Sequence, residues 1–434
     1  MGFWNKPERI IQWDIIDYYA YLPAFIIYDD VTLKFKEQDF NRFAGKIWGH
    51  KLDNGNYVIK MSMGMSVMYA PFFLCAHLFA HFSAHTPDGY TKPYAFVLVL
   101  ASLTYFILGL LLLAKILIRY FPDKVVALVL LIIAIGTNVS NYLTREAPMS
   151  HSFSFFLFAA FIYLTIKWYE KLKWQWSLLL GLVFGLISLI RPTNSVIAII
   201  FILWNIKNWS QIIGRFRYIW SSYRHFIIIG IFAMLVWFPQ IIYWKYVTGS
   251  WIYYTYGDEG FFFSSPKILN VLFGFRKGWF VYTPLMFFAF CGFTVLYKKH
   301  KQLFCGLLLF FILNLYIVSS WWCWWYGGSY GHRALIESMA VMAFPLAAIV
   351  NIFSDKKIIY KVFLLIIVSF FIIHNLFQNY KYLNTSIHFD SMTGPAYFET
   401  IDKLYPTYEY QNLLRTPDYE YALKGLPERH LDKQ

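Results

Sequence analysis

The sequence predicts an all-α polytopic membrane protein, and three observations support this fold class. The chain is 59% hydrophobic and only 14% charged, whereas a soluble domain is about half apolar and about a quarter charged. Apolar runs recur along the chain at lengths that suit membrane helices. Lysine and arginine gather in alternate loops between these runs, which is how membrane proteins mark their cytoplasmic side.

The apolar runs predict about ten transmembrane helices, since one span takes roughly 17 to 25 largely apolar residues. The run ISLIRPTNSVIAII is interrupted at Arg191, Pro192 and Thr193, and a proline there indicates a tight turn between two helices. The predicted spans are 93–118, 125–140, 152–166, 175–191, 194–206, 225–243, 278–297, 303–320, 335–353 and 360–376.

The positive-inside rule assigns the basic loops to the cytoplasm and the remaining loops to the far side. The basic loops are 119–124, 167–173, 207–225, 298–301 and 355–361. The chain then divides into a first extracytoplasmic loop (1–92), a transmembrane bundle (93–376) and a short extracytoplasmic tail (377–434). If the cell is a bacterium, this far side is the periplasm and the membrane is the inner, cytoplasmic one.

The first 90 residues pose a topological problem, because they are predicted to lie outside with nothing to carry them across. The opening stretch MGFWNKPERIIQWD has no apolar core followed by a small-residue cleavage site, so it is no secretory signal. We therefore expect an earlier transmembrane helix upstream of this start, which would raise the number of spans to eleven. The alternative is that residues 1–90 cross the membrane by an unusual route.

Charge and cysteine content exclude several classes of function. The formal charge of +14 comes from short clusters between apolar segments, which is a topology signal and does not indicate nucleic-acid binding. The four cysteines stand apart along the chain, so they predict neither a metal cluster nor a disulfide framework: Cys75, Cys291, Cys305 and Cys323.

The stretch WDIIDYY contains the first candidate site residues. Asp14 and Asp17 are spaced i,i+3, which places both carboxylates on one face of a short helix, beside Tyr18 and Tyr19. The functional interpretation is a general base at Asp14, with Asp17, Tyr18 and Tyr19 orienting an acceptor hydroxyl. The alternative is a pair of solvated loop acids.

The segment 59–82 is apolar but broken by Gly64 and Pro71, so it predicts an interfacial or re-entrant helix. Three histidines follow at i,i+4 spacing, which aligns imidazoles as metal ligands do: His77, His81 and His85. No acid or cysteine nearby completes such a site. No metal ligands are therefore predicted, although a divalent cation stays open as a cofactor.

The predicted far-side loops also carry cations. The loop NYLTREAPMSHS offers Arg145 for a phosphate, with Glu146 and His151 beside it to orient the groups. The alternative for this loop is an interfacial ion pair without chemical consequence. Arg191 lies in the turn between two spans, and polar residues at the edge of a membrane usually face a cavity or a partner.

Two later segments add further cations to this side. An amphipathic stretch after Pro266 ends in Arg276 and Lys277, where a membrane-surface helix would present them to an anionic lipid. The segment WWCWWYGGSYGHR combines indoles that can stack on a sugar with His332 and Arg333. An aromatic belt followed by a turn is the alternative for that segment.

These cations and Asp14 are all predicted on one face of the membrane. Cations stabilise a leaving phosphate, and an acid can activate an incoming hydroxyl. The set therefore matches a reaction in which a polyprenyl phosphate departs from a sugar.

The order of motifs resembles the bacterial membrane glycosyltransferases of the GT-C superfamily, near the protein O-mannosyltransferase and aminoarabinose-transferase branch. No motif is diagnostic alone, but they run through nearly the whole chain in the expected order. The motifs are WDIIDYYAYLPA with IYDDVTLKF, GMSVMYAPFFLCAHL, NYLTREAPMSHSFSFF, LIRPTN, LFGFRKGWFVYTP, WWYGGSYGHRALIE and IHFDSMTGPAYF.

The resemblance implies a GT-C type bundle with extracytoplasmic juxtamembrane helices and a catalytic acid in the first extracytoplasmic loop. By its place four residues before the first tyrosine of the YY pair, that acid is Asp14, whereas Asp17 departs from the small residue expected there. It also implies a polyprenyl-phosphate-linked sugar as donor, transfer with inversion, and a transmembrane helix just before the acid, which this sequence lacks. The acceptor is a glycan, a lipid or a protein.

Two other classes of function remain as alternatives. A transporter or flippase of a lipid-linked or anionic substrate would also use cations and broken helices. It predicts polar residues along the spans and an internal repeat, and the sequence shows mostly apolar spans and no repeat. A noncatalytic membrane scaffold would explain the spans but leaves the acid and the arginines without a use.

Overall fold

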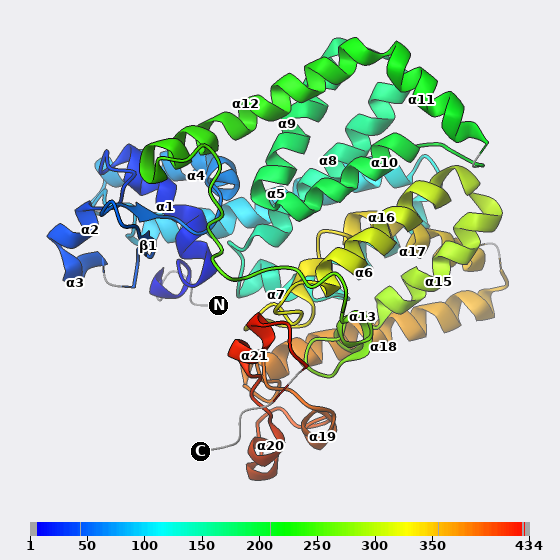
Figure 1. Cartoon of the computed structure of the whole chain (residues 1–434). Coiled ribbons are helices and arrows are strands. Elements are labelled where there is room, and N and C mark those ends of the chain that lie inside the picture. The colour runs from blue at the N-terminus through cyan, green and yellow to red at the C-terminus, as the bar shows by residue number, and fades with distance from the viewer. Residues whose placement is uncertain (1–6, 44, 209, 355, 428, 430–434) are drawn as a thin grey trace. The chain divides into compact units, whose positions relative to one another are not determined.

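The computed structural model describes the whole chain except residues 1–6, 44, 209, 355, 428 and 430–434. About two thirds of it, 67%, is helical (Figure 1). The sheet among the described residues is one antiparallel pair, β1 (His50–Lys51) and β2 (Tyr57–Val58). The all-α prediction is confirmed.

Among the described residues, five helices are long and apolar enough to cross a membrane, and each coincides with a predicted span. Every other predicted span also contains a helix, but a shorter one. A helical membrane protein is therefore supported, whereas the number of ten to eleven spans stays a prediction. The five long helices are α5 (Lys92–Leu117), α8 (Ser150–Glu170), α12 (Tyr223–Thr248), α16 (Lys301–Ser319) and α18 (Ile358–Leu383). The shorter ones are α6 (Asp123–Ile135), α9 (Trp174–Ile190), α10 (Ala198–Leu203), α15 (Leu285–Lys299) and α17 (Met339–Ser354).

Tertiary contacts divide the chain into two compact units that each draw on several stretches of sequence. Unit 1 comprises Met1–Gly109, Tyr142–Ser195 and Tyr218–Gly257. Unit 2 comprises Leu110–Asn141, Val196–Arg217 and Asp258–Gln434. The predicted loop (1–92) lies in unit 1 and the predicted tail (377–434) in unit 2, whereas the predicted bundle (93–376) is divided between the units; their placement relative to the membrane stays a prediction. Three elements besides α5 contain a boundary: α7 (Val139–Thr144), the 3-10 helix η2 (Pro192–Ile197) and α11 (Gln211–Ser221).

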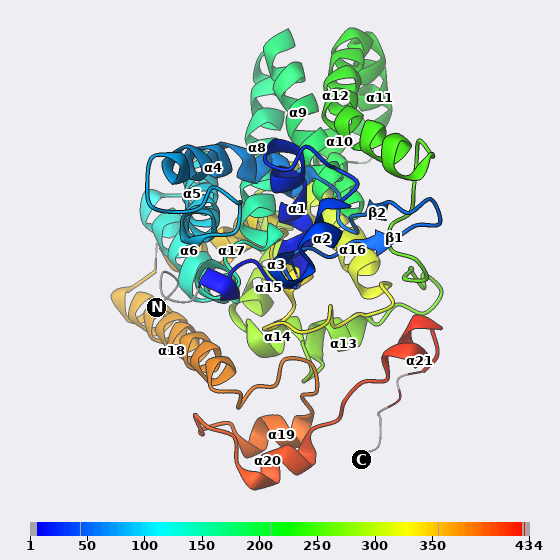
Figure 2. The same ribbon diagram turned by 90° about the vertical axis from the view of Figure 1, so that its left-hand side faces the viewer.

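Unit 1 contains the first loop together with three of the helices named above, α8, α9 and α12. The loop folds into the 3-10 helix η1 (Pro7–Arg9), α1 (Asp14–Ile26), α2 (Phe35–Gln38), α3 (Phe40–Phe43), the β1–β2 pair and α4 (Gly64–His81) (Figure 2). Its apolar side chains form one buried core with α12. This core includes Tyr21, Leu33 and Ile59 of the loop and Tyr243 and Val247 of α12. A helix does form within 59–82, as α4, whereas its interfacial or re-entrant position stays a prediction.

Small residues let α9 and α12 pack closely in unit 1 (Figure 1). Gly181 and Gly185 lie one turn apart on α9. A Cβ on Gly181 would come within 2.6 Å of the Ile229 carbonyl oxygen, and one on Gly185 within 2.8 Å of the Val236 side chain. Pairs of small residues at this spacing are what membrane helices use to bring their backbones together.

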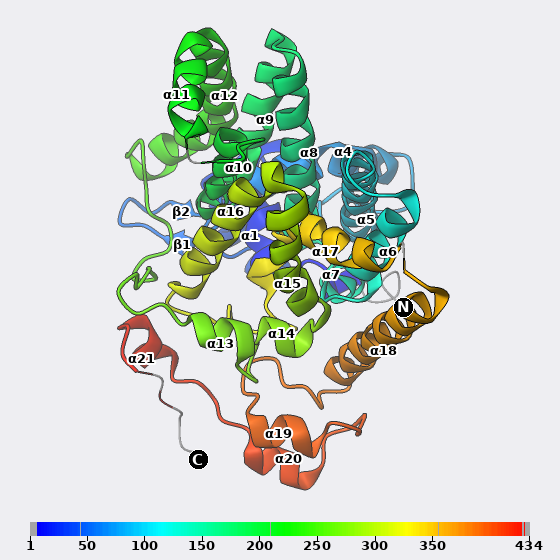
Figure 3. The same cartoon turned by 90° about the vertical axis from the view of Figure 1, so that its right-hand side faces the viewer.

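Unit 2 packs α15 against α16 and α17, and α6 against α17 and α18. Shorter elements follow or connect these helices: α13 (Ile268–Phe273), α14 (Trp279–Tyr282), η3 (Arg333–Leu335), α19 (Gly394–Glu399), α20 (Tyr408–Leu413) and α21 (Tyr419–Leu423) (Figure 3). The tail is anchored, because Tyr397 and Tyr410 share one core with Tyr282 and Tyr330.

Candidate active site

The two acids of the WDIIDYY stretch occupy the first turns of α1, and they differ in exposure. Asp14 is the first residue of the helix and is half-buried. Asp17 is buried, with 4% of its surface exposed, and its Oδ1 has no hydrogen-bond partner among the described residues. Leaving a buried carboxylate oxygen unpaired is costly, so we expect a functional reason for it.

The environment of Asp17 raises its pKa from 3.8 to about 7. Burial is the largest cause, because a charged carboxylate loses its hydration there, and the neighbouring charge of Asp14 adds to it. The charges of Lys60 and Lys36 act in the opposite direction. Near neutral pH, Asp17 is therefore close to half protonated, which is the condition in which a carboxyl group exchanges a proton most readily.

The segment that leads into α4 connects α1 to the end of α9 within unit 1. The Tyr21 hydroxyl donates to the Met61 carbonyl at 2.8 Å, and the Ser66 hydroxyl donates to the Tyr18 carbonyl. On the other side, the Ser62 hydroxyl donates to the Leu189 carbonyl. The acid pair and the end of α9 thus lie on either side of this segment.

Arg191 follows α9 directly, so this connection determines its position. Gly64 makes it possible, because a Cβ there would lie 2.7 Å from the backbone nitrogen of Ile190. The backbone N–H of Met63 is held from α12 by Gln240, whose side-chain oxygen accepts at 2.8 Å. Arg191, half-buried, therefore lies at the same end of α4 as Lys60.

The loop with Arg145 and Glu146 is also attached to α4. The Tyr69 hydroxyl of α4 donates to the carbonyl of Pro148, just after these two half-buried residues. His151 lies in the first turn of α8, fully buried, with its ring edge-to-face against Tyr142 at 4.9 Å between centroids. His151 is therefore part of the interior packing of unit 1.

The tyrosines next to the acids are core residues of unit 1. Tyr18 is 2% exposed and Tyr19 is fully buried. The Tyr19 hydroxyl donates to the Gly89 carbonyl, and its ring packs edge-to-face on Phe73 and Tyr90. Their predicted part in orienting an acceptor stays a prediction, and the structure gives both a role in holding α1 in place.

Arg276 and Lys277 lie in unit 2, where they bind backbone rather than face outward. Both are buried, at 5% and 1% exposed. The Lys277 Nζ donates to the carbonyls of Ser329 and Phe389, and an Arg276 N–H donates to the carbonyl of Asp390. These cations thus hold the tail to the glycine-rich loop, and their predicted binding of the donor phosphate stays a prediction.

His332 and Arg333 lie at the start of η3 in unit 2. Burial lowers the pKa of His332 to about 3, so its ring is neutral at physiological pH. Its Nε2 lies 3.0 Å from the Trp324 carbonyl oxygen, so Nε2 is the protonated nitrogen and Nδ1 has only a lone pair. His332 therefore has no free proton to offer to a phosphate, whereas Arg333 is half-buried and permanently charged.

Sequence reasoning missed several charged residues that belong to these surroundings. Lys36 and Lys60 act on Asp17 in unit 1, and the buried Glu337 acts on His332 in unit 2. Lys60 lies just before the apolar stretch of α4, and a cation at the start of such a stretch was a signal of a site that the sequence offered. Glu337 falls inside the predicted span 335–353, and an acid at such a place was a usable signal as well.

The histidines of α4 form a pair. The two Nε2 atoms of His77 and His81 lie 3.3 Å apart, and the Nδ1 of His77 lies 2.6 Å from the Tyr94 hydroxyl. In the part of the chain that the structure describes, no three His, Cys, Asp or Glu side chains gather as metal ligands would.

The fold and the site together define a helical membrane protein with an acid pair at the start of α1. No protein-family model matches the chain, and no curated protein sequence gives a significant match.

Proposed function

We propose that this protein is an integral-membrane glycosyltransferase that moves a sugar from a polyprenyl-phosphate donor to an acceptor hydroxyl. The observation that carries the proposal is the acid pair, in which a buried carboxyl with an unpaired oxygen lies beside a half-buried one. Such perturbed carboxyls concentrate at catalytic sites. The resemblance of the motif order to the GT-C superfamily supplies the reaction type.

Asp14 is the base in this proposal, because it is the more exposed of the two acids and an acceptor can reach it. The acceptor oxygen attacks the anomeric carbon and forms the new glycosidic bond. The bond between that carbon and the phosphate oxygen breaks, and polyprenyl phosphate leaves with the electron pair. The acceptor proton passes to the Asp14 carboxylate, and the configuration at the anomeric carbon inverts.

Asp17 acts through Asp14 in this proposal. The pKa of Asp17 is about 7, so the charge of its carboxyl group changes within the physiological pH range. Protonated Asp17 places no second negative charge beside the Asp14 carboxylate. Asp17 is therefore a positioning residue.

Arg145 and Arg191 are the proposed ligands of the departing phosphate, and the predicted part of Arg333 in binding it stays a prediction. A guanidinium group stays charged at any relevant pH and offers two parallel N–H groups to phosphate oxygens. Arg145 and Arg191 belong to unit 1 with the acids, and Arg333 belongs to unit 2. The proposal includes no metal step. The proposed setting is the bacterial inner membrane with the site facing the periplasm.

The proposal is tested with membranes from a strain that produces the protein and from a deletion strain. Both are incubated with radiolabelled polyprenyl-phosphate sugars, and label is followed into glycan, lipid and protein fractions. We expect one fraction to lose its label in the deletion strain. Asp14→Asn should give the same loss while the variant stays abundant and membrane-inserted, and full transfer by this variant would overturn the assignment.

A further inference from the structure

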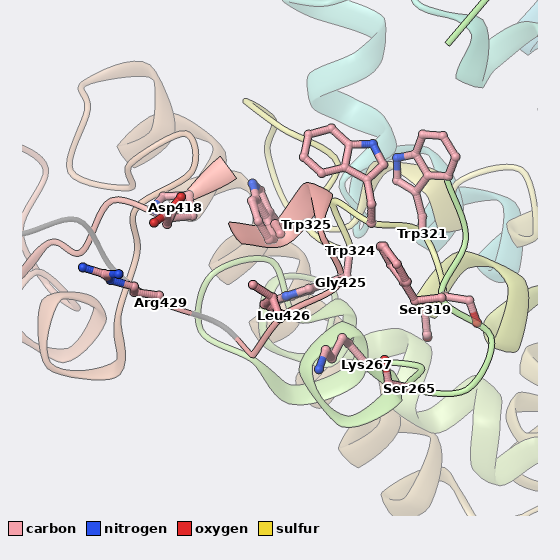
Figure 4. Close-up of a pocket in the computed structure, with 15 residues that line it drawn as sticks. Ser265, Lys267, Ser319, Trp321, Trp324, Trp325, Asp418, Gly425, Leu426 and Arg429 are labelled. Atoms are coloured by element: carbon pink, nitrogen blue, oxygen red, sulfur yellow. The ribbon is translucent and has the colours of Figure 1, made fainter. Parts of the chain in front are cut away.

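A tryptophan-rich pocket lies within unit 2, between the segment 319–325 and the tail (Figure 4). Its cavity volume is only about 30 Å³ and it opens to solvent, so a ring-sized ligand would rest at its mouth against the tryptophans. Its aromatic wall comes from four tryptophans of one loop, and its polar groups include Lys267, Asp418 and Arg429. The four tryptophans are Trp321, Trp322, Trp324 and Trp325.

The aromatic wall is fixed by backbone hydrogen bonds to the segment before α13. The N–H of Trp322 donates to the Gly260 carbonyl at 3.0 Å, and the N–H of Phe262 donates to the Ser320 carbonyl at 2.7 Å. The N–H of Lys267 donates to the Ser319 carbonyl at 2.8 Å. A wall held in this way keeps its indole rings in place before any ligand arrives.

The opposite wall is formed by the tail around α21. The Asp418 carboxylate caps this helix by accepting from the Tyr421 N–H at 3.0 Å, and its own N–H donates to the Arg429 carbonyl at 3.0 Å. Tyr419 joins the two walls, because its hydroxyl lies 3.3 Å from the Trp325 Nε1 and donates to Asp390 at 3.0 Å. The pocket is therefore a built feature of unit 2.

Two polar groups that line the pocket have no hydrogen-bond partner among the residues that the structure describes. The Nε1 of Trp322 and the hydroxyl of Ser319 are both buried and unpaired, and Ser319 is fully buried. Buried donors of this kind are normally satisfied, so a ligand or water is expected to complete them. The faces of Trp324 and Trp325 are buried, whereas Trp321 and Trp322 are half-exposed and can receive a ring.

We propose that this pocket binds one sugar ring of a saccharide. The C–H face of a pyranose stacks on an indole ring, and its hydroxyls need donors and acceptors around the edge. Trp321 and Trp322 supply the stacking surface, and Asp418 supplies acceptors. Lys267 and Arg429 outnumber this single acid, so a sugar with a negative substituent fits at least as well as a neutral one.

The role of the bound saccharide as an acceptor rests on the proposed function, and the saccharide site itself does not. A glycosyltransferase with a saccharide acceptor needs a site for that acceptor besides the site of the donor sugar. Saccharide binding itself does not depend on whether transfer occurs. Binding and transfer can therefore be measured separately.

The test measures saccharide binding to the full-length protein in lipid nanodiscs, by saturation-transfer NMR and calorimetry, without any donor. The probes are methyl glycosides of glucose, mannose and N-acetylglucosamine, and glucuronic acid. Inorganic phosphate serves as a non-sugar anion. We expect at least one sugar to bind with its ring protons saturated, and phosphate alone to bind far more weakly.

Variants assign the binding to this pocket. Trp321→Ala and Trp322→Ala should each weaken the best sugar at least tenfold, and Trp322→Phe should recover part of the loss because it keeps a ring but lacks the N–H. Asp418→Asn should weaken binding while preserving the helix cap, since Asn caps as well as Asp. The matched control is Trp220→Ala, because Trp220 is 83% exposed on α11 and should leave binding unchanged.

Three outcomes would overturn the inference: no sugar binds, phosphate binds as tightly as the best sugar, or Trp321→Ala and Trp220→Ala behave alike. Each of these can occur while Asp14→Asn still abolishes transfer, so the inference can fail without the proposed function. The opposite combination, sugar binding without any transfer, would contradict the proposed function alone.

Discussion

Asp17→Asn should change how the stability of the protein depends on pH. In the folded state the pKa of Asp17 is about 7, whereas its ordinary value is 3.8. Between these two values the folded protein binds more protons at this position than the unfolded chain does. Stability therefore falls as pH rises through this window. Asparagine has no charge to bury, so the variant should lack this loss.

The size of the effect follows from the same two values. At about 1.36 kcal/mol per pH unit, the difference corresponds to at most about 4 kcal/mol of stability that the wild type loses between about pH 4 and pH 7. Solvent has little access to a side chain that is 4% exposed, so screening reduces this figure only modestly. An unsatisfied asparagine amide would cost about 1–3 kcal/mol, but equally at every pH.

The measurement is the difference in unfolding temperature between Asp17→Asn and wild type in nanodiscs, from pH 4 to pH 8. We expect this difference in unfolding temperature to grow in favour of the variant as pH rises, with a midpoint between about pH 4 and pH 7. At pH 5 the infrared signal of a protonated carboxyl should be present in wild type and absent in the variant. Asp14→Asn is the matched control, since removing that charge should move the midpoint to lower pH. If the difference in unfolding temperature stays constant with pH, the conclusion that Asp17 is buried and half protonated is wrong.

Two further predictions concern packing. Gly185→Leu should lower the stability of unit 1 by several kcal/mol, because its Cβ would clash with α12. Gly230→Leu should be tolerated, because a Cβ at Gly230 meets open space. Equal unfolding temperatures for the two variants would contradict the close crossing of α9 and α12. Lys277→Met should speed proteolysis of the tail, because it removes two hydrogen bonds from a buried ammonium group, at about 1.5–3 kcal/mol each. Lys403→Met, which breaks an exposed pair with Glu399, should leave the rate of proteolysis unchanged.

The helices could be predicted from the sequence, because apolar length and loop charge determine them locally. Each predicted span contains a helix, and the helix α9 does end just before Arg191, where η2 follows. Their assignment to two units could not be predicted, because it depends on contacts between residues far apart, such as Gly64 against Ile190.

The candidate site was predicted in part. Spacing indicated that Asp14 and Asp17 share a helix face, but it gave no reason to expect one buried and one half-buried acid. That difference arises from the packing of α4 on α1. In the same way, Arg276 and Lys277 look like headgroup ligands in sequence, and only the folded tail shows that their N–H groups bind carbonyls.

The central claim is transfer from a lipid-linked donor that depends on Asp14. Its most direct test uses purified protein in proteoliposomes that contain a polyprenyl-phosphate sugar labelled in the sugar, together with the acceptor fraction identified in membranes. We predict that wild type moves label to the acceptor and releases polyprenyl phosphate in equal amount, and that Asp14→Asn does neither. If label instead crosses the bilayer still attached to the lipid, or if Asp14→Asn transfers it as fast as wild type, the protein is not the enzyme proposed.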